Sequence, residues 1–263
     1  MTMSTNFGAA AADYAKFRAG FPDSLFDRLS GFGVGLRGQA IVDLGTGTGT
    51  LARGFARQGA RVTGVDPDSR MLEQARQLAQ SEDVSVDWRV GKAEAIPLGD
   101  GTMDILSAGQ CWHWFDGAQA AREFARVARP DGRIVIAHFN WLPLPGSMVL
   151  ATERLIETHN PSWPYGGSIG IHTQSLAPLA AVGFKVDELF AYDVDVPYTP
   201  EAWRGRIRAS AGVGASMTPE GVASFDTALA RLLETEFPGD VLTAPHRVFA
   251  IIYSRSGRGD STS

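Results

Sequence analysis

Residues 40–51 read AIVDLGTGTGTL, and this stretch decides the fold. Its first five residues are apolar and partly β-branched, apart from Asp43, which is typical of a short buried strand. Gly45, Gly47 and Gly49 then alternate with threonine, and an apolar segment of helical period begins at Leu51. Glycine permits a tight turn and lets a ligand approach the backbone. The sequence therefore predicts a strand, a glycine turn, and a helix whose N-terminus favours an anion.

The alternation of strands and helices continues on both sides of this stretch. Residues 21–32 have helical periodicity, and Pro22 suits the first turn of a helix, so a helix is predicted there. Strands are predicted at residues 61–66, 84–90, 103–108 and 133–137, and helices at 71–79 and 116–128. Asp116, with Gln119 three residues later, has the pattern of a helix cap. This rhythm predicts an α/β protein with a doubly wound parallel sheet.

The second half of the chain is less regular. Residues 140–170 contain four prolines, more than a simple crossover needs, and predict an inserted cover. Strands are predicted at 184–191 and 246–253. Thr199 and Thr218 each precede a proline, which predicts two helix starts. We expect an N-terminal helical cap at 1–38, a ligand-binding core at 39–138, substrate-covering insertions with the rest of the sheet at 139–254, and a loose tail at 255–263.

Composition limits the classes of partner. The chain has 263 residues, 24 Lys plus Arg and 29 Asp plus Glu, giving a net charge of −5, so nothing predicts binding to nucleic acid or to an anionic membrane. No run of about 18 apolar residues and no basic leader followed by an apolar stretch occurs. Cys111 is the single cysteine, which excludes an internal disulfide and fits a reducing compartment. We expect a cytoplasmic protein and do not interpret the Arg258-Gly259-Asp260 tripeptide as an adhesion signal.

Several motifs narrow the ligand. A P-loop is excluded because no Gly-Lys-Ser/Thr follows the glycines, and a dinucleotide fingerprint would need glycine at Thr50. Four ordered blocks, VDLGTGTG at 42–49, VDPD at 65–68, AEAIPL at 93–98 and VARPDGR at 127–133, together resemble the class I S-adenosylmethionine-dependent methyltransferases. YAKFRAGFP at 14–22 and WHWF at 112–115 look like the small-molecule, trans-aconitate-type branch (methyltransferase type 11). The resemblance covers about residues 10–140 and implies a Rossmann-like, mostly parallel sheet with one antiparallel strand and helical insertions.

This resemblance also implies S-adenosylmethionine as cofactor and assigns its contacts. The methionine end would be held by Asp43 and by the turn residues Gly45, Thr46, Gly47 and Gly49. Asp66, at the end of the second strand, would accept the ribose hydroxyls, unless it only caps a helix. Ala93 and Glu94 would lie against the adenine, although Lys92 stands where many relatives carry an aspartate. Tyr14, Arg18 and Gln110 complete the predicted cofactor contacts; a solvated helix face is the alternative for Tyr14 and Arg18.

Residues 110–115 should line the methyl-transfer cleft because they follow the fourth strand. His113 is the predicted general base, with His138 and His172 as alternatives. A nucleophilic role for Cys111 has no visible relay. His246 is expected only to open a strand. Asp193 and Asp195 have no histidine nearby in sequence, so no metal site is predicted. The acceptor pocket is expected at residues 139–172 and 199–241. Its aromatic and cationic side chains are expected to come from Trp141, Trp163, Tyr165, Trp203, Arg204, Arg206 and Arg208. The alternative for the three arginines is a solvated helix flank.

The function expected from the resemblance is methylation of a small molecule, with an oxygen-methyl product as the first choice. Methylation of carbon, nitrogen or sulfur is the alternative within the enzymes. A binding protein that keeps the cofactor pocket without catalysis, and a nicotinamide oxidoreductase, are the other classes. Thr50 and the later blocks oppose the oxidoreductase. The identity of the acceptor, the use of a base and the oligomeric state stay open.

Overall fold

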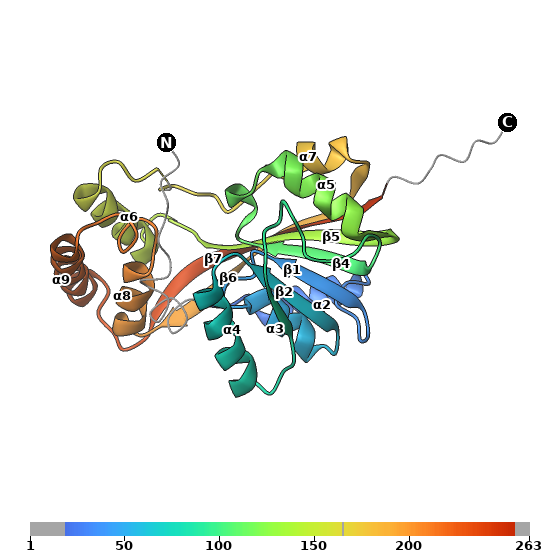
Figure 1. Cartoon of the computed structure of the whole chain (residues 1–263). Coiled ribbons are helices and arrows are strands. Elements are labelled where there is room, and N and C mark those ends of the chain that lie inside the picture. The colour runs from blue at the N-terminus through green and yellow to red at the C-terminus, as the bar shows by residue number, and fades with distance from the viewer. Residues whose placement is uncertain (1–18, 165, 256–263) are drawn as a thin grey trace. The chain divides into compact units, whose positions relative to one another are not determined.

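The computed structural model describes residues 19–164 and 166–255. Seven strands form one sheet in the order β3-β2-β1-β4-β5-β7-β6 (Figure 1). Their bounds are β1 Ala40–Leu44, β2 Arg61–Asp66, β3 Asp87–Val90, β4 Met103–Gly109, β5 Ala128–Trp141, β6 Phe184–Tyr198 and β7 Leu242–Arg255. The sheet is mostly parallel and includes an antiparallel pair. The predicted Rossmann-like α/β architecture is confirmed.

The order of strands reverses at β1. On one side Asp43 of β1 pairs with Gly64 of β2, and on the other side it pairs with Ser107 of β4, both in parallel register. In open sheets of this kind, ligands bind outside the carboxyl ends of the strands at such a reversal. The residues that follow β1, β2 and β4 are therefore the first place to look for a site.

The described part of the chain divides into two compact units, and the larger comprises residues 20–138, 172–191 and 248–255. Its helices are α2 Asp23–Gly31, α3 Thr50–Arg57, α4 Ser69–Ser81, α5 Gly117–Val127 and α7 Leu176–Ala181. Figure 1 shows α5 and α7 on one face of the sheet and α3 and α4 on the other. Phe124 and Val127 of α5 are fully buried in a core cluster with Leu106 and Ile134 of the strands. Asp116 caps α5 by accepting from the Gln119 amide, as predicted.

Among the described residues, the smaller unit comprises residues 19, 139–164, 166–171 and 192–247. It contains α6 Met148–His159, α8 Pro200–Arg208 and α9 Pro219–Glu236. Thr199 and Thr218 cap α8 and α9, so both predicted helix starts are confirmed. Trp203 of α8 is fully buried and donates from Nε1 to Thr152 Oγ1 at 3.0 Å. This unit has an apolar core of its own.

Several elements differ from the sequence-based expectation. The strand predicted at 184–191 continues to Tyr198. The sequence did not indicate its second half, because β6 is an edge strand with many exposed positions and carries Pro197, a residue that argues against a strand. The strand predicted at 246–253 spans 242–255 and passes through Pro245. Helices α6 and α7 were not predicted. Among the described residues, no helix combines the length and apolarity that crossing a membrane requires.

Candidate functional site

The turn between β1 and α3 is built on three left-handed glycines. Gly45, Gly47 and Gly49 have φ angles of +61°, +56° and +80°, a conformation that side chains other than glycine adopt only at a cost. The Thr46 amide donates to the Val65 carbonyl at 3.0 Å, which fastens the turn to β2. The glycine pattern predicted from sequence is thus required by the backbone itself.

The surroundings distinguish Gly47 from the other two glycines. A methyl group on Gly45 would lie 2.9 Å from Cys111 Sγ, and one on Gly49 would overlap the indole of Trp88. Among the described residues, the only atom within 4 Å of a methyl group on Gly47 would be Met71 Cε, at 3.5 Å, which is ordinary contact. Packing therefore requires glycine at two positions, whereas at Gly47 the backbone is left open to an approaching group.

Asp43 lies under this turn with only 2% of its surface exposed. Its Oδ2 accepts from Thr46 Oγ1 at 2.5 Å and its Oδ1 accepts from Ser107 Oγ at 2.7 Å. Burial raises the pKa of Asp43 to about 6, although the two hydroxyl groups lower it in part. Both carboxylate oxygens are thus engaged within the protein, and Asp43 fixes the turn and supplies charge beneath it.

Asp66 closes the turn from the neighbouring strand. Its Oδ2 accepts from the Gly47 amide at 2.8 Å and its Oδ1 from the Asp68 amide at 2.9 Å. Burial raises the pKa of Asp66, and the two backbone amides oppose that rise. The carboxylate is 8% exposed. Capping of the next helix, the alternative reading of Asp66, belongs instead to Asp68, whose side chain accepts from the Arg70 amide.

The electrostatics of this site favour a positively charged ligand. Asp43 and Asp66 lie at the same edge of the sheet, and the charge of Asp66 further raises the pKa of Asp43. Within residues 19–164 and 166–255, these two buried carboxylates have no cationic group among the causes of their pKa shifts. Buried carboxylates without a counter-charge are costly, and a cation bound above the turn would relieve that cost.

The segment assigned to the adenine lies after β3. Ala93 is 3% exposed and belongs to the main core cluster. Glu94 is partly buried, and its Oε1 accepts from the Asp116 amide at 2.9 Å, so it joins this segment to the start of α5. Lys92 is exposed and forms a β-bridge with Ala95. The described geometry thus gives Glu94 a positioning contact within the protein.

Gln110 begins the segment that follows β4 and has an unusual backbone. Its φ is +58°, rare for a residue other than glycine, and its amide donates to the Ala137 carbonyl at 2.9 Å. Such conformations concentrate at functional sites. The next residue, Cys111, donates from Sγ to the Leu44 carbonyl at 3.1 Å. The segment therefore packs directly on the end of β1 and the glycine turn.

The predicted base and its alternatives lie near one another. His113 is exposed in a 3₁₀ turn, Trp112–Trp114, and its ring centroid is 4.6 Å from that of Trp114. His138 is 2% exposed near the end of β5, with its centroid 6.5 Å from His113 and 3.7 Å from His172. Burial lowers the pKa of His172. In the sequence, His113 and His138 are 25 residues apart and His138 and His172 are 34 residues apart, so only the fold brings them together.

Residues of the smaller unit resolve into different roles. Arg204 and Arg208 both bind Asp226 and Glu201, so they form an ion-pair network between α8 and α9. Arg206 instead lies over the Trp141 ring, 4.8 Å from its centroid. For Arg204 and Arg208, the ion pairs favour the interpretation as a helix flank over the interpretation as part of an acceptor pocket. Arg206 instead forms a cation–π pair with Trp141.

Other sequence candidates receive plain structural assignments. Asp193 accepts from Arg247 at 2.6 and 2.8 Å. His246 is 2% exposed within β7. No group of three or more His, Cys, Asp or Glu side chains within the described part of the chain could hold a metal ion. Tyr14, Arg18, Tyr165 and the tripeptide at 258–260 lie outside the described residues.

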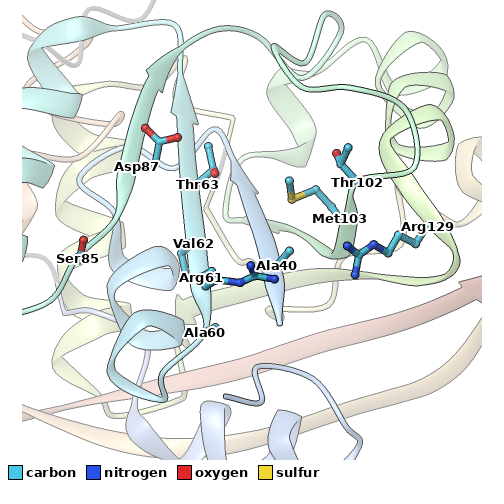
Figure 2. A pocket seen from close by; sticks show the side chains of 10 residues that line it. All are labelled: Ala40, Ala60, Arg61, Val62, Thr63, Ser85, Asp87, Thr102, Met103 and Arg129. Carbon is cyan, nitrogen blue, oxygen red and sulfur yellow. The ribbon is translucent and has the colours of Figure 1, made fainter. Parts of the chain in front are cut away.

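One cavity lies away from this site, at the start of the strands. It has a volume of about 540 Å³ and is lined by Ala40, Ala60, Arg61, Val62, Thr63, Ser85, Asp87, Thr102, Met103 and Arg129. Figure 2 shows the side chains of Arg61 and Arg129 on either side of Ala40, the first residue of β1. Since the glycine turn follows the last residue of β1, this cavity opens at the opposite edge of the sheet and is not the site described above.

Two contributors escaped the sequence analysis. Ser107 holds Asp43 across 64 residues of chain, and Trp88 of β3 forms the wall that excludes a side chain at Gly49. Ser107 carries no sequence signal because it is one small polar residue in an apolar strand. Trp88 offers a weak signal, since a large aromatic in a short strand marks a contact of some kind.

The site geometry can be compared with known proteins. Residues 42–136 match the family model described as a methyltransferase domain. An uncharacterized methyltransferase of Mycobacterium tuberculosis is 38% identical over 132 residues, which covers 50% of this chain and 51% of the relative. A ubiquinone biosynthesis O-methyltransferase of Methylocella silvestris is 38% identical over 106 residues, covering 40% of this chain and 41% of that protein. The chain thus matches about half the length of these curated relatives or less.

Solved structures agree on the fold. A candidate type II methyltransferase of Anaeromyxobacter dehalogenans superposes with a TM-score of 0.63 at 22% identity, covering 91% of this chain and 97% of that one. At that level of identity, the likeness concerns the fold. The matched segment contains Asp43, the three glycines, Asp66 and Gln110, which are the residues gathered at the carboxyl edge. Residues 42–136 are therefore similar to the methyltransferase-domain family, and the chain has the fold of the Anaeromyxobacter dehalogenans methyltransferase.

Proposed function

We propose that this protein transfers a methyl group from S-adenosylmethionine to a small molecule, with oxygen as the first acceptor atom. The observation that carries the proposal is the pair of buried carboxylates, Asp43 and Asp66, on either side of an open glycine turn. The donor has an ammonium and a sulfonium group, whose positive charges complement these two carboxylates. It supplies an activated methyl group when bound.

The same electrostatics oppose a nicotinamide dinucleotide. Dinucleotide-binding turns place a pyrophosphate at the helix N-terminus, with backbone amides as donors. Here the Gly47 amide already donates to the Asp66 carboxylate, and Asp43 lies beneath the turn. A pyrophosphate would meet two negative charges there. We therefore favour the sulfonium donor over the dinucleotide.

In this proposal the chain's own residues bind and orient. Gly45, Gly47 and Gly49 shape the cradle, and Thr46 and Ser107 hold Asp43 in place. Asp66 would meet the ribose, and Ala93, Glu94 and Gln110 would border the base and the methyl-transfer position. Holding a nucleophile in line with the methyl group is worth several kcal/mol, up to ~7–11 in well-oriented model reactions.

Oxygen is preferred as the acceptor atom because the Methylocella silvestris relative carries the name of an O-methyltransferase. The acceptor is proposed to be a small molecule, by resemblance to the small-molecule branch. Tyr14 and Arg18 stay in the proposal as cofactor contacts. Methyl transfer to nitrogen, carbon or sulfur, and a binding protein without catalysis, are decided by the experiment below.

The test is calorimetric titration with S-adenosylmethionine, S-adenosylhomocysteine, NAD and NADH, using the intact chain and Asp66→Asn. Removing the charge-assisted interactions of Asp66 should weaken binding of the sulfur ligands ~10- to 100-fold. Glu73→Gln is the matched control, because Glu73 is an exposed acid on α4 that pairs with Arg76. Tighter binding of the nicotinamides would overturn the proposal.

A second arm identifies the reaction. The protein is incubated with donor labelled in the methyl group and a panel of alcohols, phenols, carboxylates, amines and thiols, and the products are analysed by mass spectrometry. Label on oxygen supports the first choice, and label on another atom corrects it. Binding of the donor without transfer to any member of the panel would favour the binding-protein alternative.

A further inference from the structure

Three histidines from separate segments form a row in the larger unit. His113 belongs to the turn after β4, His138 to β5, and His172 to the segment before α7. The rings of His138 and His172 are stacked, with centroids 3.7 Å apart and planes 14° apart. The His113 ring lies 6.5 Å from that of His138. No sequence spacing indicates this grouping.

The row lies at the same edge of the sheet as the glycine turn. Gly109, the last residue of β4, pairs with Ala137 of β5, so His138 comes one residue after that pair. The Gln110 amide donates to the Ala137 carbonyl, and Cys111 Sγ donates to the carbonyl of Leu44 at the end of β1. The segment 110–115 therefore connects the histidines to the proposed methyl-donor site.

Stacking at this distance restricts the charge of the pair. Two imidazolium rings 3.7 Å apart would repel strongly in a partly buried setting. The pair is therefore expected to carry at most one positive charge across the neutral range. Besides each other, the rings of His138 and His172 face Phe249 of β7, at 6.4 and 6.3 Å, and His113 faces His138. Burial lowers the pKa of His172.

We propose that His172 accepts the proton of a hydroxyl or amine methyl acceptor and that His138 positions the His172 ring. The inference rests on the proposed function and narrows its acceptor class to groups that carry a proton. The acceptor oxygen or nitrogen forms a bond to the methyl carbon with its lone pair, and its proton passes to an imidazole nitrogen of His172. The sulfur keeps the electron pair of the broken sulfur–methyl bond and leaves as a neutral thioether.

The two rings suit these different roles by their exposure. His172 is partly exposed, so it can meet an acceptor and return its proton to water, whereas His138 is 2% exposed. A neutral imidazole near pH 7 is competent as a base. His113, the base expected from sequence, is exposed and lies against Trp114, which is itself 47% exposed. The geometry thus favours His172 over His113.

A titration that needs no turnover tests the pair itself. Imidazole carbon and nitrogen resonances are followed against pH in the intact chain and in His138→Phe, which keeps a buried ring but removes its proton site. We expect coupled steps for His138 and His172 in the intact chain and one simple step for His172 in the variant. Independent titration of both rings near pH 6.5 in the intact chain would overturn the proposal.

Kinetics test the role of His172. His172→Gln should lower kcat ~10²- to 10⁴-fold for a hydroxyl or amine acceptor and abolish the rise of kcat with pH below neutrality. Donor affinity by calorimetry should stay within about twofold. His159→Gln should keep both the rate and the pH profile; His159 is a matched control on α6, where Nδ1 lies 3.0 Å from the Leu155 carbonyl.

The outcomes separate this inference from the proposed function. Failure to bind the donor would overturn the proposed function, while the coupled titration still reports on the histidine pair. Donor binding and methyl transfer with an unchanged rate in His172→Gln would overturn the inference alone. Transfer only to carboxylates, which need no base, would overturn it as well, and so would a rate loss confined to His113→Gln.

Discussion

Replacing Asp43 by asparagine tests the electrostatic reasoning about the glycine turn. The carboxylate is 2% exposed and accepts hydrogen bonds from Thr46 and Ser107. Asparagine has nearly the same shape. Its amide oxygen accepts from one hydroxyl, and its amide nitrogen donates to the other, since a hydroxyl serves in both roles. The substitution thus removes a buried charge and keeps the contacts.

The magnitude follows from the shifted pKa. Burial raises the pKa of Asp43 from 3.8 to about 6, so the folded protein binds this proton more tightly than the unfolded chain. That stabilisation is fully present below pH 4 and is lost as the pH rises through about 6. Each pKa unit is worth about 1.4 kcal/mol, so above pH 6 the ionised carboxylate costs about 3 kcal/mol relative to acid conditions. Asparagine does not carry this cost.

The assay is urea unfolding of the intact chain and Asp43→Asn across pH 4 to 8. The difference between the two proteins at each pH cancels the titration of all other groups. We expect the variant to be more stable by up to about 3 kcal/mol at pH 8 and the difference to shrink toward pH 4. Donor affinity should fall at least tenfold at pH 8, because the charge that attracts the ligand's cation is gone. Asp87→Asn, an exposed acid of β3, is the control.

Two results would refute this reasoning. A difference in stability that does not change with pH would show that Asp43 is not buried as a costly charge. Unchanged donor affinity in a variant of higher stability would show that the carboxylate has no part in binding.

Two further predictions concern the glycine turn and the helical unit. Gly49→Ala places a methyl group against Trp88 at a positive φ and should lower the free energy of unfolding by ~2–4 kcal/mol. Gly47→Ala has room for the methyl group, so its free energy of unfolding should fall by only ~1–2 kcal/mol, because of the strained backbone. At a matched folded fraction, Gly47→Ala should weaken donor binding more than Gly49→Ala does. Equal losses in the free energy of unfolding for the two variants would contradict this reasoning. Burial raises the pKa of Asp226, but the arginines of α8 lower that pKa by more than burial raises it, so the net shift is downward. The contribution of the Asp226 carboxylate to the stability of the fold is therefore present above pH 4 and is lost as the pH falls through its folded pKa. Asp226→Asn should therefore destabilise the protein by ~1–3 kcal/mol at pH 7, and this loss should shrink as the pH falls below 4. A loss that does not change with pH would exclude the ion pairs as its cause.

Local signals were sufficient for much of the fold. Hydrophobic periodicity located the strands that precede Gly45 and Asp66, and capping residues such as Asp116, Thr199 and Thr218 located helix starts. These features depend on neighbours within a few residues of chain, so the sequence contains them directly. The edge strand β6 was shortened in the prediction because its exposed side chains lack the apolar pattern on which such predictions rely.

The resemblance to the methyltransferases was visible in the sequence, because it rests on four blocks in fixed order, with glycines and acids at strand ends. Only the tertiary structure decided what those residues touch. It brought Ser107 to Asp43 across the β1–β4 ladder, the Asp66 carboxylate to the Gly47 amide, and His172 onto His138. The physical reason is that hydrogen bonds, burial and ring stacking depend on distances in space. Residues tens of positions apart acquire those distances only when parallel strands align their carboxyl ends at one edge of the sheet.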